Sequence, residues 1–157
     1  MNIASEKRLS AVYPELARRI RALDVNLGKL GIQIVVVQGL RTFAEQDALF
    51  AQGRTRPGQI VTRAKGGQSL HNYGLAVDVA PVILEGGGKI DWNDLHKFFV
   101  IGQEGKKLRL EWGGDWKKFL DKPHLQMPSP SINVLFGLYQ KGKLPAVWAE
   151  VERRATK

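Results

Sequence analysis

The stretch Ser69-Leu-His-Asn-Tyr-Gly-Leu-Ala-Val-Asp78 places a carboxylate inside an apolar segment. Residues 75–79 are short and mostly apolar, which predicts a buried strand. Gly74 can adopt a turn conformation that lets the side chains of His71 and Asp78 converge. A carboxylate in a buried strand is costly unless it is paired or metal-bound. The stretch therefore predicts either an ion pair between Asp78 and an arginine or a metal site.

The residues before this stretch predict a helix, a strand and a second helix. Apolar side chains separated by three or four positions mark one helix face: Leu16, Ile20, Leu23, Leu27 and Leu30. Pro14 suits the first turn of that helix and Gly31 suits its end. A buried strand is expected at 32–38. Thr42 and Glu45 have the spacing of a capping box, which predicts that a helix begins there.

The remaining chain predicts more strands and helices. Asp91 or Asn93 is expected to cap a helix that buries Leu95, Phe98 and Phe99. Other elements are a helix at 5–12, a loop at 54–70, a turn at Gly86–Gly88, strands at 108–112 and 123–127, and two helices after Ser131 broken by Gly142 and Pro145. This order predicts an α+β fold with a small, largely antiparallel sheet and flanking helices. We expect residues 1–157 to form a single domain.

The composition restricts the chemistry. The chain has no cysteine, which excludes disulfides, thiolate metal sites and a cysteine nucleophile. It has 24 Lys plus Arg and 15 Asp plus Glu, a net charge of +9, which favours an anionic partner. The basic residues form no single run. No apolar run approaches the roughly 20 residues of a membrane span.

The histidines are the natural candidates for metal ligands. There are three of them, His71, His96 and His124, and a catalytic zinc takes three protein ligands from His and carboxylates. From spacing alone, a single histidine is more often structural, and Asp78 could pair with an arginine. The residues by themselves leave both interpretations open.

Several segments, taken together, resemble a known family. Ser-x-His-x-x-Gly-x-Ala-x-Asp at 69–78, followed by an acid-x-x-His segment at 121–124, resembles the D-alanyl-D-alanine carboxypeptidase and dipeptidase family of zinc peptidases. Three further segments resemble its L-alanyl-D-glutamate endopeptidase branch, found among phage endolysins: Gly39-Leu-Arg41-Thr42, Phe50-Ala-Gln-Gly-Arg54 and Trp112-Gly-Gly-Asp-Trp116.

The resemblance implies a role for each matching residue. It implies one zinc per chain, bound at the sheet by His71, Asp78 and His124, with Asp121 as general base. Arg41 would steady the scissile carbonyl or a nearby substrate carboxylate. Possible supporting or substrate-contacting residues are Ser69, Gln38, Tyr73 and Asp115.

Some of these assignments have alternatives. The family's carboxypeptidases usually have Glu at the position of Asp121, so Glu111 is a second candidate base. Ser69 is expected to hydrogen-bond near the site rather than act as a nucleophile, because no histidine is left to activate it. His96 is expected at the surface. Trp112 and Trp116 are expected in the core rather than as sugar platforms.

The resemblance implies a zinc endopeptidase that cuts the L-alanyl-D-glutamate bond of peptidoglycan during cell lysis. The alternatives are a D-alanyl-D-alanine carboxypeptidase or dipeptidase, an inactive wall-binding relative, and a basic nucleic-acid-binding domain. We expect residues 1–157 to be a single catalytic domain without a separate wall-binding domain. We also expect a monomer that binds peptidoglycan and the anionic envelope, not nucleic acid. The first ten residues contain no apolar segment, so we expect synthesis in the cytoplasm without a signal peptide and release through a membrane pore.

Overall fold

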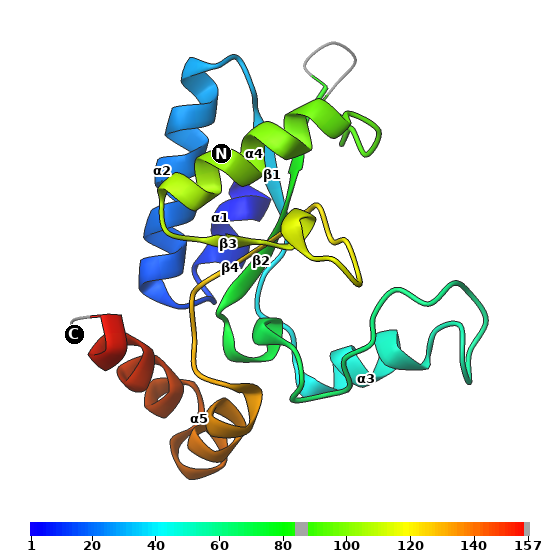
Figure 1. The fold of residues 1–157 in the computed structure, drawn as a ribbon, viewed down its shortest axis with the longest axis vertical. Helices are drawn as coiled ribbons and strands as arrows, with labels where there is room; N and C mark the ends of the chain where they lie inside the picture. The colour runs from blue at the N-terminus through cyan, green and yellow to red at the C-terminus, as the bar shows by residue number, and fades with distance from the viewer. Residues whose placement is uncertain (84–87, 156–157) are drawn as a thin grey trace.

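An antiparallel sheet lies at the centre of the computed structural model, which describes residues 1–83 and 88–155 (Figure 1). Within those residues the sheet has four strands in the order β1-β2-β4-β3, and each neighbouring pair is antiparallel. The strands are β1 (Ile34–Gln38), β2 (Ala76–Pro81), β3 (Glu111–Trp112) and β4 (His124–Gln126). The expected α+β class and the small antiparallel sheet are confirmed.

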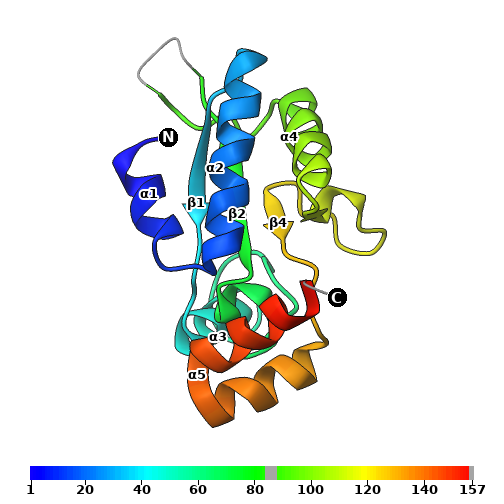
Figure 2. The ribbon, with the colours of Figure 1, turned by 90° about the vertical axis from the view of Figure 1, so that its left-hand side faces the viewer.

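Helices flank this sheet. They are α1 (Ile3–Leu9), α2 (Pro14–Lys29), α3 (Phe43–Ala51), α4 (Leu95–Lys107) and α5 (Ile132–Ala155), with the short 3₁₀ helices η1 (Leu70–Tyr73) and η2 (Gly113–Asp115). In Figure 2, α1 lies on the β1 side of the sheet and α4 on the β4 side. Helix α5 packs against η1. No described helix is both long and apolar enough to cross a bilayer.

Helix α2 supplies much of the core. Its apolar stripe packs against the sheet, and the four residues Leu16, Ile20, Leu23 and Leu27 are fully buried. Pro14 is its first residue, and Gly31 follows its end with φ of 73°. Leu30, expected on the same face, is instead 57% exposed. It is the C-cap residue with a non-helical backbone, so it no longer follows the helical period.

Helix α4 begins at Leu95, one residue later than a cap at Asn93 predicts and three later than a cap at Asp91 predicts. Asp94 caps it by accepting a hydrogen bond from the backbone N–H of Lys97. The buried residues are Phe98, Ile101, Gly102 and Gly105, at intervals of three and four. The expectation that Leu95 and Phe99 are buried is therefore wrong, since both are more than half exposed.

The other expected elements differ mainly in length. The capping box of Thr42 and Glu45 begins α3 as predicted. Strand β3 is shorter than 108–112, because α4 continues to Lys107 and Arg109 then turns with φ of 59°. The break in α5 falls at Gly142–Lys143, and the chain is again helical at Pro145. The expected turn at 86–88 falls partly outside the described residues.

Candidate metal centre

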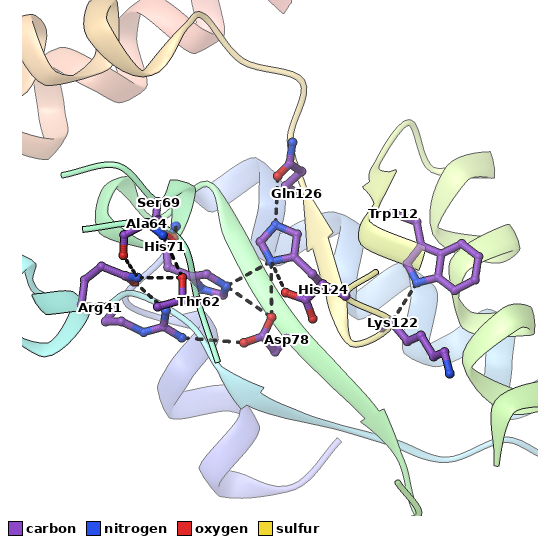
Figure 3. Close-up of polar contacts among 12 residues, drawn as sticks. Arg41, Thr62, Ala64, Ser69, His71, Asp78, Trp112, Lys122, His124 and Gln126 are labelled. Carbon is purple, nitrogen blue, oxygen red and sulfur yellow. Dashed lines mark hydrogen bonds and ion pairs between the residues drawn. The ribbon is translucent and has the colours of Figure 1, made fainter. Parts of the chain in front are cut away.

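Three side chains from separate elements meet at one point beside the sheet. His71 comes from η1, Asp78 from β2 and His124 from β4, where Asp78 and His124 are directly paired across the strands. His71 Nε2 lies 3.2 Å from His124 Nδ1 and 3.2 Å from Asp78 Oδ1. His124 Nδ1 lies 3.4 Å from the same oxygen. Figure 3 shows the three side chains converging.

The remaining nitrogen of each imidazole faces a hydrogen-bond acceptor. His71 Nδ1 lies 2.9 Å from the carbonyl oxygen of Gly39, and His124 Nε2 lies 2.9 Å from Gln126 Oε1. Gln126 is oriented in turn by donating its amide N–H to Glu111 Oε2 at 2.6 Å. These partners require protons on the outer ring nitrogens. In the neutral rings, lone pairs on His71 Nε2 and His124 Nδ1 therefore point inward.

Without a cation, three electron-rich atoms would crowd together. Asp78 Oδ1 is buried and has no hydrogen-bond partner among the residues that the structure describes. Burial disfavours its charge, but the two imidazoles outweigh that effect and lower the pKa of Asp78. Burial also opposes a charge on His124, yet Asp78 raises the pKa of His124 above its usual 6.5. In the metal-free protein, protonation of His124 is thus the way to relieve the repulsion.

The donor set fits a divalent cation. Two imidazole nitrogens and one carboxylate oxygen are a common zinc ligand set, and ligands about 2.0–2.1 Å from a tetrahedral zinc lie about 3.3 Å apart. The observed separations are 3.2, 3.2 and 3.4 Å. Among the described residues, this is the one group of three His, Cys, Asp or Glu side chains arranged to hold a metal ion.

Asp121 lies next to this group. Its Oδ2 is 4.0 Å from His124 Nδ1, and burial, with help from Asp78, raises the pKa of Asp121. The Trp112-Gly-Gly segment fixes its position. The N–H of Asp121 donates to the Gly113 carbonyl, the Trp112 indole donates to the Lys122 carbonyl at 2.7 Å, and a Cβ on Gly113 would collide with the Asp121 backbone.

Arg41 also lies beside the three candidate ligands. Its Nη1 donates to Gln46 Oε1 at 2.7 Å, and its Nη2 lies 3.8 Å from Asp78 Oδ2. Its backbone N–H donates to the His71 carbonyl at 3.0 Å. Burial lowers the pKa of Arg41, against the effect of Asp78, but a guanidinium stays charged at any ordinary pH.

The group opens into a cleft of about 720 Å³. Its lining includes the segment from Val61 to Ala64, after α3, and the side chains of Trp116 and Phe119. The Trp116 ring lies 4.9 Å from the His124 ring. The expectation that Trp116 is in the core is therefore wrong, because it forms part of the cleft wall. Trp112 is 7% exposed and belongs to the core, as expected.

The structure brings only one of the four possible supporting residues to the cleft. Ser69 lines it, caps η1, and accepts from the backbone N–H of His71 at 3.3 Å. Tyr73 is fully buried and donates to the Gly67 carbonyl. Gln38 pairs with Asp78 along the sheet but lines a separate pocket beside α1. Asp115 forms an exposed ion pair with Lys106 at 2.8 Å.

The rival base Glu111 and the third histidine lie elsewhere. Glu111 is exposed, does not line the cleft, and holds Gln126. Glu111 is therefore connected to His124 only through Gln126, by two successive hydrogen bonds. His96 is exposed on α4, as expected.

Sequence reasoning missed three side-chain amides. Gln46 is fully buried and holds Arg41. Asn72 is 2% exposed, donates to the carbonyls of Arg41 and Thr42, and accepts from Gly67 N–H. Gln126 orients His124. Only Asn72 carried a usable signal, since it lies inside the 69–78 motif.

Comparison with known proteins agrees with this geometry. A family model described as D-alanyl-D-alanine carboxypeptidase matches residues 62–127. The peptidoglycan L-alanyl-D-glutamate endopeptidase CwlK of Bacillus subtilis is 42% identical, over 75% of this chain and 74% of its own length. The L-alanyl-D-glutamate peptidase of Escherichia phage T5 is 37% identical, over 71% of this chain and 77% of its own.

A solved structure shows the same fold. The L-Ala D-Glu endopeptidase ChiX of Serratia marcescens superposes with a TM-score of 0.61 and 27% identity, covering 82% of this chain and 89% of that one. Fold, site and similarity together define a peptidase of the D-alanyl-D-alanine carboxypeptidase type. Within that class, the chain belongs to the peptidoglycan L-alanyl-D-glutamate endopeptidase family, which confirms the resemblance noted in its motifs.

Proposed function

We propose that this chain hydrolyses the L-alanyl-D-glutamate bond of peptidoglycan stem peptides and uses one zinc ion to do so. The observation that carries the zinc assignment is the 3.2–3.4 Å triangle of His71 Nε2, Asp78 Oδ1 and His124 Nδ1. The relatives named for this bond support the substrate, since they share 37–42% identity over most of this chain.

The three inward-facing atoms would hold the ion. Zinc in such a site polarises a carbonyl and brings the pKa of a bound water to about 7. The outer hydrogen bonds to Gly39 and Gln126 keep the two imidazoles in the ligand tautomer, which raises their basicity and fixes their orientation.

Asp121 is proposed as the general base. Its carboxylate lines the cleft beside the ligands, within reach of a water held there. A raised pKa suits this role, because a base with a pKa nearer the working pH returns its proton more readily. Asp121 would take the proton of the attacking water and pass it to the amine of the leaving D-glutamate.

Arg41 is proposed to steady the oxygen of the scissile carbonyl as negative charge develops on it. The guanidinium points toward the ligand group because Gln46 and Asp78 hold its two terminal nitrogens. Such a donor, fixed before the reaction begins, needs little reorganisation during it. The cation is also buried enough for its field to be weakly screened.

The same proposal extends to the setting in which the enzyme works. We propose that it acts as a monomer on the wall after passing through a membrane pore made by another protein. The net charge of +9 would help it associate with an anionic envelope.

Digestion of purified sacculi tests the function directly. Mass spectrometry of the products should show stem peptides that begin with D-glutamate, and a chelator should abolish their release. Release of single D-alanine residues with the L-alanyl bond intact would instead favour a carboxypeptidase.

A further inference from the structure

The segment that follows α3 contains four cations, and three of them are occupied or face elsewhere. Arg54 donates to the carbonyls of Phe50 and Thr62 and stacks on the Phe50 ring. Lys65 lies over the same ring. Arg56 is exposed and does not line the cleft. Of these four cations, only Arg63 lines the cleft that contains the metal ligands, which Arg41 also lines.

Hydrogen bonds hold the backbone on both sides of Arg63. The Gln46 side-chain amide donates to the Ala64 carbonyl at 2.8 Å and to Thr62 Oγ1 at 3.3 Å, and Arg54 donates to the Thr62 carbonyl at 3.0 Å. The carbonyl end of Gln46 accepts from Arg41. One buried glutamine therefore sets the position of Arg41 and of the backbone that carries Arg63.

The guanidinium of Arg63 has spare hydrogen-bonding capacity. It lies over the ring of Phe119, another residue that lines the cleft, with its Cζ 5.6 Å from the ring centroid. Among the described residues, the Arg63 guanidinium has neither a hydrogen bond nor an ion pair. A guanidinium near an aromatic ring can still direct its planar N–H groups at a carboxylate.

The substrate of the proposed reaction carries such a group. D-Glutamate, whose amine leaves in this reaction, has two carboxyl groups. One continues the stem peptide as an amide, and the other is a free carboxylate. Arg41 is already engaged by Asp78 and Gln46, so it is less available to a second carboxylate. We propose that Arg63 binds the free carboxylate of D-glutamate and makes the enzyme prefer the acid over its carboxamide. This inference rests on the proposed function.

Two soluble peptides test it: N-acetyl-L-alanyl-γ-D-glutamyl-L-lysine and the same peptide with the free glutamyl carboxyl as carboxamide. The zinc-loaded enzyme should cleave the acid with the higher kcat/KM. Arg63→Gln should lower kcat/KM for the acid by about tenfold, the usual scale for a charge-assisted hydrogen bond, and affect the amide much less. Arg56→Gln, in the same loop but outside the cleft, should leave both values near wild type.

Each other outcome contradicts the inference in a recognisable way. An equal loss of kcat/KM on both peptides would mean that Arg63 supports the loop structure and does not bind the carboxylate. An acid preference that survives in Arg63→Gln would assign the carboxylate to another cation. If the wild-type enzyme cut neither peptide at the L-alanyl bond, the proposed function itself would fail, and this inference with it.

Discussion

His71 Nε2 lies 3.2 Å from His124 Nδ1, while the opposite nitrogen of each ring faces an acceptor. With the outer nitrogens protonated, the inner ones face each other as two lone pairs beside the Asp78 carboxylate. Such an arrangement is repulsive unless a cation or an added proton occupies the centre. The backbone and the outer hydrogen bonds thus define a cation site before any ion binds.

Removing one ligand should therefore remove the metal. Purified protein is expected to contain about one zinc per chain, and His71→Ala should lose both zinc and activity, because two protein ligands hold zinc poorly. Elemental analysis and sacculus digestion check this, with His96→Ala on α4 as the control that keeps both. Active wild-type protein without any bound metal would exclude the zinc assignment.

Asp121 and Glu111 can be separated by paired variants. Asp121→Asn should retain zinc and lose roughly 10²-fold in kcat, the usual scale for a general base. Glu111→Gln should cost much less, because Glu111 is exposed and contacts the site only through Gln126. Rates on a soluble stem peptide, with zinc content measured in parallel, decide the matter. A reversed order would assign the base to Glu111 and leave the metal site intact.

Gln126 should control zinc affinity without being a ligand. Gln126→Leu removes the acceptor of the His124 Nε2 proton, so the ring is free to take the tautomer that places a proton on the ligand atom. Loss of such an outer partner typically weakens metal binding by about 10- to 100-fold. Competition with a chelator of known affinity measures this. An unchanged zinc affinity would show that the β4 backbone alone orients His124.

The sequence could predict what depends on local pattern. The face from Leu16 to Leu27 follows helical spacing, and the Thr42–Glu45 box lies within four residues, so both appear in the structure as expected. The grouping of His71, Asp78 and His124 came from motif resemblance, because spacing alone left it open. The structure then supplied the distances that make the grouping a cation site.

What sequence could not predict depends on contacts between distant segments. Gln46 looks like a surface residue of α3, yet it is fully buried because residues 62–64 fold over it. Phe99 looks like a core residue, but the buried residues of α4 are Phe98, Ile101, Gly102 and Gly105, and Phe99 is 53% exposed. Trp116 lines the cleft because it directly follows η2 (Gly113–Asp115), and its ring contacts the His124 ring.

Metal binding should reverse the pH dependence of stability near the site. The pKa of His124 is raised in the metal-free fold, so its contribution to stability is present below pH 6.5 and is lost as pH rises through the folded pKa. The pKa of Asp121 is also raised, so its contribution to the stability of the metal-free fold is likewise lost as pH rises. Zinc instead requires a neutral His124, so its stabilisation grows with pH. The difference in Tm between zinc-loaded and chelated protein should therefore widen from about pH 5.5 to 8, as measured by thermal unfolding. A constant difference would mean that His124 does not change protonation when the metal binds.

Arg41 should require its guanidinium shape and not only its charge. Its Nη1 and Nη2 bridge Gln46 and Asp78, and a lysine ammonium cannot span both partners while pointing toward a substrate oxygen. Arg41→Lys should retain zinc but lose roughly 10²-fold or more in kcat, the scale seen when one oxyanion donor is removed. Gln46→Leu, which frees one side of the guanidinium, should lower kcat in the same direction by a smaller factor. Steady-state rates on the soluble peptide measure the loss of kcat. Zinc content and Tm, measured for each variant, distinguish that loss from unfolding. Near-normal turnover by Arg41→Lys would make Arg41 a structural partner of Asp78 and leave the stabilisation of the carbonyl oxygen to the metal.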